Sequence, residues 1–438
     1  MSRIFVLGYE LPSLIEGATI ARNYRTYQFV EPLLQGKHQV SLVVGSDRDQ
    51  EEAPHALGEG LVYHRVKFRR YGWLPKVKRL YRDFGPDGVL AVTFYNCVRA
   101  ARCGFDKPIW MDIYGDRMAE SQVWQTGFGS SRGKLGSLAN LRDILSRGDV
   151  FSTCGTPQKF AMVGQLSMIG RLNRHNCGYE FVYPILPGAP RQAAARSAES
   201  RVRGKLVKED DFVVLWCGGY NIWTDVETLF QALEHAMSRA PNLKFVSVGG
   251  RVGPTHWNNV YERFQEMIAA SEYKERFILL GWKSTADVPD YYREADVGVS
   301  LDAFHYETLL GTRTRLTEMM RYGLPAITTL GCELSYIIRD RELGLTFEIG
   351  NAKEFGDQIV ILAQDQERLA KMSERALHHA STTLSFFETT RPFRQWSAEP
   401  CFAPDYEVQD SIIKRVENRL RFLAARTMWN ILGIGKAD

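Results

Sequence analysis

Two arginines stand two positions apart at the predicted start of a helix. Gly311 and Thr312 precede Arg313 and Arg315 and follow a predicted strand that ends near Leu301. Thr312 is a good N-cap residue, and a helix N-terminus presents free N–H groups and a positive dipole to an anion. Guanidinium groups pair well with the oxygens of a diphosphate. The segment therefore predicts a diphosphate site, and the alternative is that both arginines solvate a helix face.

Glu318 lies three residues beyond Arg315 in the same predicted helix. A carboxylate at this place could accept hydrogen bonds from the hydroxyls of a ribose. The alternative is an ion pair between Glu318 and one of the arginines.

Asp112 and Asp116 follow a predicted strand in the N-terminal half, at residues 108–111. Two carboxylates at the carboxyl end of a strand could position an acceptor hydroxyl or take its proton. We predict both as catalytic, together with Arg313 and Arg315. The alternative for the pair is a helix N-cap plus a turn aspartate.

Short apolar runs, which predict buried strands, alternate with amphipathic stretches almost from end to end of the chain. These predicted strands position the candidate residues. Runs that are apolar throughout suit strands buried on both faces, as parallel sheets require. The strand-like runs lie at residues 4–7, 40–44, 89–92, 109–111, 150–151, 212–216, 243–248, 277–280, 295–301 and 325–328.

The alternation stops near residues 183–190, where three prolines are followed by a polar stretch without a core-forming face. We interpret this segment as a linker between two domains. The predicted fold class is α/β, with two Rossmann-like, doubly wound parallel-sheet lobes and a C-terminal helical extension. The predicted domains are 1–190, 208–382 and 383–438. Ligands of such sheets bind beyond the carboxyl ends of the strands.

Composition excludes several classes of protein. The 438 residues are 45% hydrophobic and 24% charged, which excludes wholesale disorder, and a net charge of +4 is too weak for a dedicated nucleic-acid binder. Seven scattered cysteines without a CxxC pair predict reduced thiols rather than a disulfide framework or a zinc site. With no signal-peptide pattern and no apolar run of membrane-spanning length, we expect a cytoplasmic location.

The second half resembles a known family. Residues 318–327, with the sequence EMMRYGLPAI, are similar to the E-A-M-A-x-G-x-P-V-I segment of family 4 glycosyltransferases, which have the GT-B fold. Residues 216–229 are similar to that family's G-R-x-x-x-x-K-G-x-x-x-L loop, and further matching segments follow in the family's order. The resemblance covers roughly residues 212–362 well, and the N-terminal half only as a general pattern.

The resemblance implies an enzyme that moves a sugar, with retention of configuration, from a nucleotide sugar in the second lobe to an acceptor hydroxyl in the first. No metal and no cofactor are implied. Glu318 would bind the ribose, Trp282 could form a wall for the base or simply pack under its loop, and Gly17 and Ala18 resemble a small-residue loop on the acceptor side. The predicted donor-binding residues are Gly218, Gly219, Tyr220, Asn221, Arg251, Trp282, Glu307, Gly311, Thr312 and Glu318.

The chain departs from the family at three positions. Gly219 and Thr224 stand where the family has its diphosphate-binding Arg and Lys, and Leu310 stands where it has the first glutamate. Arg313, Arg315 and Arg251 are the expected sources of the missing charge. Glu307 could replace the missing glutamate only if the intervening loop folds differently.

Other functions remain open. A nucleotide-sugar epimerase on the same fold would need clustered carboxylates or histidines, but only His305 lies in the donor segment. A catalytically silent nucleotide-sugar binder would explain the missing Arg, Lys and Glu. A nicotinamide oxidoreductase is disfavoured, because no GxGxxG follows the first strand.

Two segments suggest partners. Residues 65–82 hold eight Lys or Arg, no acid and several aromatic residues, which suits an anionic membrane surface or a lipid-linked acceptor; a solvated edge is the alternative. Apolar residues at helical spacing between 412 and 428 indicate a helix that packs back, forms a homodimer or contacts a membrane. The expected acceptor is a glycan or a lipid-linked molecule at the inner face of the membrane.

Overall fold

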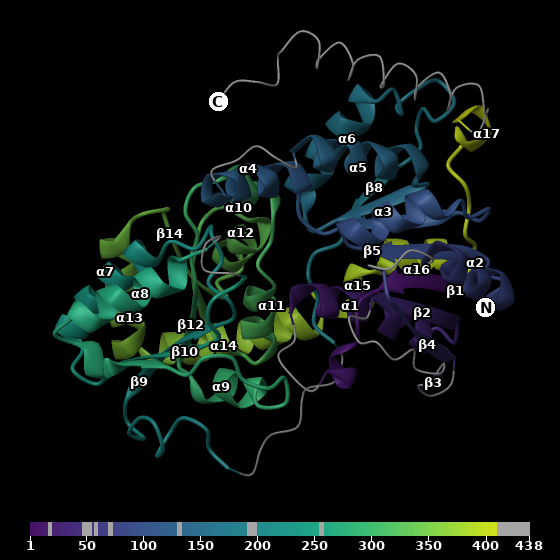
Figure 1. Ribbon diagram of the computed structural model, residues 1–438. Helices are drawn as coiled ribbons and strands as arrows, with labels where there is room; N and C mark the ends of the chain where they lie inside the picture. The colour runs from purple at the N-terminus through teal and green to yellow at the C-terminus, as the bar shows by residue number, and fades with distance from the viewer. Residues whose placement is uncertain are drawn as a thin grey trace, which may run out of the picture.

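The computed structural model describes residues 1–15, 20–45, 55–56, 60–68, 73–128, 134–190, 199–253 and 258–409. Two α/β lobes lie side by side, and helices from the C-terminal part of the chain run from the second lobe back to the first (Figure 1). The predicted fold class is confirmed.

The first lobe is built on a sheet with the strand order β3-β4-β2-β1-β5-β6-β7-β8. All neighbouring strands run parallel except β3, which runs antiparallel to β4. Every residue of β5 and β6 is buried, as expected for strands covered by helices on both faces. The strands are β1 (Arg3–Gly8), β2 (Gln39–Gly45), β3 (His55–Ala56), β4 (Leu61–Val66), β5 (Gly88–Val92), β6 (Ile109–Ile113), β7 (Val150–Thr153) and β8 (Val182–Pro184). The helices are α1 (Ala21–Gln35), α2 (Trp73–Phe84), α3 (Phe94–Cys103), α4 (Arg117–Phe128), α5 (Lys134–Arg147) and α6 (Thr156–Met168).

The second lobe has a parallel sheet with the order β11-β10-β9-β12-β13-β14. Its central strand β9 is buried along its whole length. The strands are β9 (Phe212–Cys217), β10 (Leu243–Val248), β11 (Phe277–Leu279), β12 (Val297–Ser300), β13 (Ala326–Thr329) and β14 (Gly344–Phe347). The helices are α7 (Val226–Arg239), α8 (Val260–Ala270), α9 (Val288–Glu294), α10 (Tyr306–Leu310), α11 (Thr314–Arg321), α12 (Glu333–Asp340), α13 (Ala352–Gln364) and α14 (Gln366–Ser381).

Among the parallel strands of each sheet, the strand order reverses direction once. The reversal lies between β1 and β5 in the first lobe and between β9 and β12 in the second. Loops that leave such a point on opposite faces of a sheet open a crevice at the carboxyl ends of the strands. The residues after β9 and after β12 are therefore the ones that the fold places at a ligand crevice.

The chain after α14 packs on the first lobe through α15 (Phe386–Thr389), α16 (Arg391–Ala398) and α17 (Tyr406–Gln409). The rings of Phe393 and Trp396 lie 5.3 and 5.7 Å from that of Trp110 on β6. A buried ion pair, from Arg171 Nε to Asp405 Oδ2 at 2.9 Å, fastens the end of this segment. The apolar pattern at 412–428 lies outside the described residues.

In the part of the chain that the structure describes, no helix is long and apolar enough to cross a membrane.

Candidate donor site

Glycine loops at the carboxyl ends of β9 and β10 lie in direct backbone contact. The N–H of Gly218 donates to the carbonyl of Val248 at 2.7 Å. Gly249 has a φ of +127°, and a Cβ on it would lie 2.0 Å from the carbonyl oxygen of Gly218. No side chain fits at Gly249, and Gly218, with a φ of +122°, also adopts a conformation that favours glycine. The N–H groups of Gly218 and Gly249 are thus used inside the protein, by Val248 and Gly281, and the two glycines let the loops approach each other closely.

Arg315, in the first turn of α11, lies against these loops. Its guanidinium carbon is 3.9 Å above the ring of Trp216, and Nη2 donates to the carbonyl of Gly219 at 2.9 Å. Its Nη1 is buried without a hydrogen-bond partner among the described residues. Burial lowers the pKa of Arg315, the direction expected for a cation without a carboxylate partner. The predicted role of Arg315 in binding a diphosphate fits this geometry.

Arg313 is placed differently. Its Nε donates to Asp302 at 2.6 Å, and Nη1 and Nη2 donate to the two carboxylate oxygens of Glu307 at 3.0 and 2.7 Å. Nη1 also donates to the carbonyl of Thr312. Only 7% of Arg313 is exposed. Two carboxylates neutralise it, so neither Arg313 nor Glu307 has the geometry of a donor-binding or catalytic group, and the pair instead holds the loop before α11.

Gly311 and Thr312 form part of that loop. A Cβ on Gly311 would lie 2.6 Å from Oε1 of Glu307, so only glycine fits beside the ion pair. The sequence placed the N-cap one residue too early, because α11 begins at Thr314 and its N-cap is Arg313. The hydroxyl of Thr312 is instead buried and has no hydrogen-bond partner in the described structure.

Glu318 lies one turn beyond Arg315 on α11. It is 6% exposed, and Oε2 accepts from Arg321 Nη1 at 3.2 Å. Burial raises its pKa, and its charge contributes to the raised pKa of Tyr24 on α1 of the first lobe. Glu318 therefore lies where the lobes meet. Its ion-pair partner is Arg321, and not Arg313 or Arg315 as the sequence left open.

Trp282 follows β11 and is 45% exposed. A Cβ placed on Gly219 would lie 3.3 Å from a carbon of the Trp282 ring, and a Cβ placed on Gly250 would lie 3.5 Å from Nε1 of Trp282. A large aromatic face against both glycine loops fits a wall for a nucleotide base.

Three other predicted donor residues lie less favourably. Tyr220 is fully buried, and its hydroxyl shares a hydrogen bond with Ser247 at 2.8 Å, so its ring belongs to the core. Arg251 is exposed and pairs with Glu262 at 3.4 Å. Asn221 is half-buried in the loop after β9, where its carbonyl accepts from the N–H of Thr224.

The predicted catalytic aspartates of the first lobe have structural partners. Both oxygens of Asp112 pair with Arg25, at 2.6 and 3.0 Å, and Ser152 donates to Oδ1 at 2.6 Å. Asp112 is completely buried, so the role of activating an acceptor does not fit it. Asp116 accepts from the N–H groups of Met118 and Ala119 at the start of α4, which is the N-cap alternative.

A carboxylate that sequence reasoning missed lies beside them. Glu120, on α4, has Oε1 only 2.7 Å from where a Cβ on Gly115 would be, and Oε2 is 3.4 Å from Arg117. Burial, and next the charge of Glu307 from the second lobe, raise the pKa of Glu120 to about 7. Its place within an ordinary helical stretch gave no sequence signal.

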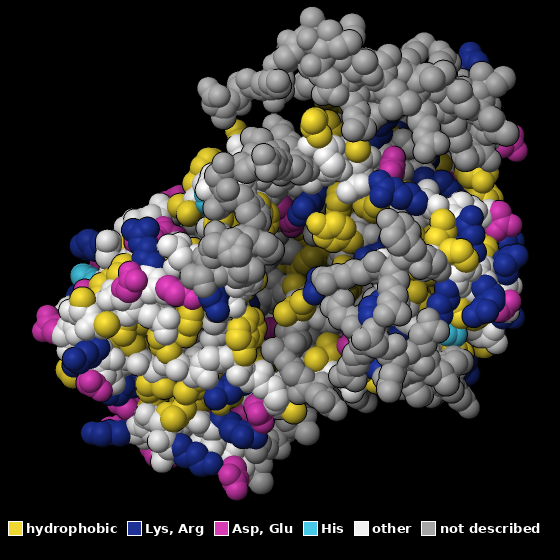
Figure 2. Space-filling model, in the orientation of Figure 1, with side chains coloured by type: hydrophobic (Ala, Val, Ile, Leu, Met, Phe, Trp, Pro, Cys, Tyr) yellow, Lys and Arg dark blue, Asp and Glu magenta, His cyan; other side chains and the backbone are white. Residues whose placement is uncertain are grey.

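The lobes touch through polar groups close to these residues. The hydroxyls of Tyr114 and Thr314 are 2.7 Å apart, and the hydroxyl of Thr156, at the start of α6, donates to Glu333 of α12 at 3.0 Å. The face shown in Figure 2 is hollowed between the two lobes. Gly17 and Ala18 lie outside the described residues.

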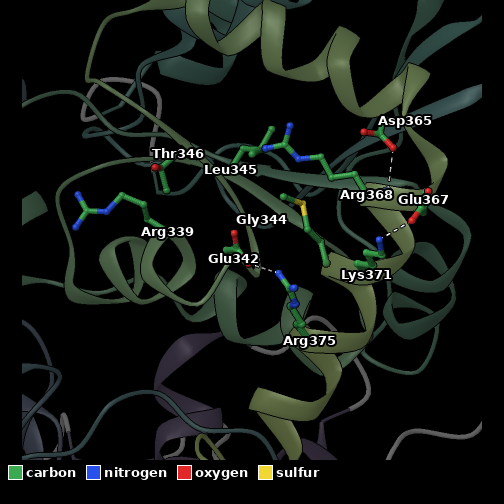
Figure 3. A pocket seen from close by; sticks show the side chains of 11 residues that line it. Arg339, Glu342, Gly344, Leu345, Thr346, Asp365, Glu367, Arg368, Lys371 and Arg375 are labelled. Atoms are coloured by element: carbon green, nitrogen blue, oxygen red, sulfur yellow. Dashed lines mark hydrogen bonds and ion pairs between the residues drawn. The ribbon is translucent and has the colours of Figure 1, made fainter.

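A separate cavity of about 560 Å³ lies at the edge of the second lobe, beside the amino end of β14 (Figure 3). Its cations are largely neutralised: Arg375 pairs with Glu342, and Lys371 pairs with Glu367. The cavity lies beside the edge strand β14 and is not lined by the glycine loops after β9 and β10, so it is separate from the candidate donor site. In the described ranges, no three His, Cys, Asp or Glu side chains gather as a metal site.

Comparison with known proteins identifies similar domains and folds. Residues 211–365 match the model of the family described as glycosyl transferases group 1. Sucrose-phosphate synthase from Thermosynechococcus elongatus superimposes with a TM-score of 0.68 at 14% identity, over 91% of this chain and 100% of that one. The chain has the GT-B fold. Anabaena HepE in complex with UDP-glucose shares this fold, with a TM-score of 0.66 at 15% identity over 91% and 100% of the two chains.

TarM from S. aureus, in a complex that contains UDP, matches with a TM-score of 0.61 at 10% identity, over 91% of this chain and 100% of that chain. No curated protein is detectably similar in sequence. The second lobe of this GT-B chain thus matches the model of the glycosyl transferases group 1 family, and its glycine loops, Arg315 and Trp282 all lie within the matched residues.

Proposed function

We propose that the protein is a glycosyltransferase that moves a sugar from a nucleotide-sugar donor to an acceptor hydroxyl. The observation that carries the proposal is Arg315, a cation without a carboxylate partner among the described residues, set against two glycine loops at the strand-order reversal of a group 1 domain. In a nucleotide-sugar reaction, this is the place where negative charge must be stabilised.

Each donor-side residue has a task in this reaction. Arg315 and the N–H groups at the start of α11 stabilise the charge that builds on the leaving diphosphate. Glu318 binds the ribose, and Trp282 stacks on the base. Arg313 does not touch the substrate. It keeps the loop before α11 in place through Asp302 and Glu307.

The first lobe (1–190) holds the acceptor and the second (208–382) holds the donor, and their contact excludes water that would hydrolyse the donor. Transfer of a hexose proceeds with retention and without a metal ion, and the leaving diphosphate helps to deprotonate the acceptor. The acceptor is a glycan or a lipid-linked molecule, in polysaccharide or glycoconjugate assembly at the cytoplasmic face of a membrane. The described residues 383–409 cross back to the first lobe.

A panel of nucleotides and nucleotide sugars in a thermal-shift assay tests donor binding, because stabilisation grows with ligand concentration relative to Kd. Incubation of the stabilising nucleotide sugar without acceptor, with and without EDTA, then tests the chemistry. Slow hydrolysis that survives EDTA supports the transferase. A strict requirement for a divalent ion contradicts metal independence.

A silent nucleotide-sugar binder is the second candidate, because Gly219 and Thr224 replace the family's Arg and Lys. Binding without any hydrolysis or transfer would favour it. A changed sugar would favour an epimerase.

A further inference from the structure

Arg99, on the second turn of α3, is a half-buried cation without a carboxylate partner among the described residues. Its guanidinium carbon lies 4.0 Å over the ring of Phe68, and Nη1 donates to Asn96 Oδ1 at 2.7 Å. Burial lowers the pKa of Arg99. The buried Arg25 and Arg171 differ, since each forms an ion pair with an aspartate. An unpaired cation removed from water is costly to a fold, so its presence needs a reason.

Two further arginines are linked to Arg99 through tyrosine side chains. Arg117 packs over Tyr95, with its guanidinium carbon 5.6 Å from the ring centre, and Nη2 donates to the hydroxyl of Tyr95 at 3.3 Å. Tyr95 stands four residues before Arg99 on α3, so the two share a helix face. Arg22 lies 4.7 Å over the ring of Tyr9, which also interacts electrostatically with Arg99.

Among the described residues, Arg117 is the one arginine of this cluster that pairs with a carboxylate. Glu10 is held by Arg65 and by the hydroxyl of Tyr63 at 3.0 Å. Glu120 pairs with Arg117 Nη1 at 3.4 Å, and Nε of Arg117 is buried without a hydrogen-bond partner in the described structure.

The cluster also faces the gap between the lobes. Tyr9 follows β1, Phe68 follows β4, Tyr95 follows β5 and Arg117 follows β6, so all four come from the carboxyl edge of the first sheet. The contact of Arg117 with Glu120 places the cluster next to the second lobe, because Glu120 interacts with Glu307 there.

We propose that Arg22, Arg99 and Arg117 form a phosphate-binding subsite, and that the acceptor held by the first lobe carries a phosphate group. Guanidinium groups pair in a forked geometry with phosphate oxygens. The rings of Phe68 and Tyr95 pack against the guanidinium groups of Arg99 and Arg117. The assignment of the phosphate to an acceptor rests on the proposed transferase, whereas phosphate binding itself does not.

Calorimetric titration with inorganic phosphate, glucose 6-phosphate and glucose tests the subsite. The titrations are carried out on an Arg315→Met variant, so that phosphate binding at the glycine loops does not contribute to the measured heat. In that background, glucose 6-phosphate binds and glucose does not. Arg99→Met or Arg117→Met weakens the binding of both phosphate ligands at least about tenfold. Arg102→Met is the matched control, because Arg102 lies on the same helix but pairs with Asp143, and it leaves the binding unchanged.

Flotation with phosphatidylglycerol and phosphatidylcholine vesicles separates the two sources of phosphate. If phosphatidylglycerol vesicles bind, Arg99→Met abolishes this binding and glucose 6-phosphate does not bind, the ligand is a lipid headgroup. If glucose 6-phosphate binds and the vesicles do not, the ligand is a soluble sugar phosphate. Wild-type affinity of folded Arg99→Met for every phosphate probe would overturn the proposal, as would the absence of all such binding. Donor hydrolysis by Arg99→Met, measured separately, reports on the transferase alone.

Discussion

Alanine replacements of Arg313 and Arg315 separate a structural arginine from a functional one two residues away. Arg313→Ala leaves the carboxylates of Asp302 and Glu307 buried without their partner, because they are only 6% and 4% exposed. Removing one member of a buried ion pair costs about 3–5 kcal/mol, which lowers the melting temperature of a domain of this size by on the order of 10 °C.

Arg315→Ala removes a side chain that pairs with no described carboxylate and donates a single hydrogen bond to a carbonyl. We expect little change in folding, whereas loss of one donor to the leaving group slows catalysis by about 100- to 1000-fold. This changes the expectation from the sequence, which gave both arginines the same role.

Melting curves and kcat with the donor identified by the nucleotide panel are measured for both variants. Lysine replacements serve as a control, because Arg313→Lys cannot rebuild the forked contact with Glu307 and should remain destabilised. The reasoning is refuted if Arg313→Ala melts like the wild type, or if Arg315→Ala keeps full activity.

Three further predictions follow from buried groups. The pKa of Glu120 is raised to about 7 in the folded protein, so the free energy of unfolding should fall by up to about 3 kcal/mol as the pH rises from 4.5 through 7. Glu120→Gln should flatten the profile of melting temperature against pH. An unchanged slope in this variant would contradict the prediction. Gly249→Ala places a Cβ 2.0 Å from the carbonyl oxygen of Gly218, so the variant should lose nucleotide binding in the thermal-shift assay. Nucleotide affinity equal to that of the wild type would show that the two loops can move apart. Asp405→Asn weakens the buried pair with Arg171, which should make the C-terminal segment more sensitive to limited proteolysis at an unchanged protease concentration; equal cleavage rates would show that the pair does not hold it.

The fold could be predicted because the signal is local. Strands such as β5 and β9 are apolar at nearly every position and buried at every one, and a strand with two buried faces has few alternatives to a parallel sheet. The positions of Trp282 and Arg315 beside the glycine loops could be anticipated for a related reason, since Trp282 follows soon after a strand and Arg315 lies in the first turn of a helix.

The roles of other residues depended on partners that are distant in sequence. Asp112 pairs with Arg25, 87 residues away, and no spacing rule indicates that pairing. Arg313 looked like Arg315 until the fold brought Asp302 and Glu307 to its guanidinium group. Tertiary ion pairs decide which charged side chains remain available for a ligand, and these pairs form only when each lobe folds.

Binding of nucleoside diphosphates and monophosphates to the wild type and to Arg315→Met tests the central claim most directly. Calorimetry with nucleotides of the base that the thermal-shift panel selects should show that the wild type binds the diphosphate more tightly than the monophosphate. In Arg315→Met, this ratio of affinities should be smaller by at least about tenfold. The same preference in a folded Arg315→Met protein would contradict the account, because the diphosphate would then be held by other groups.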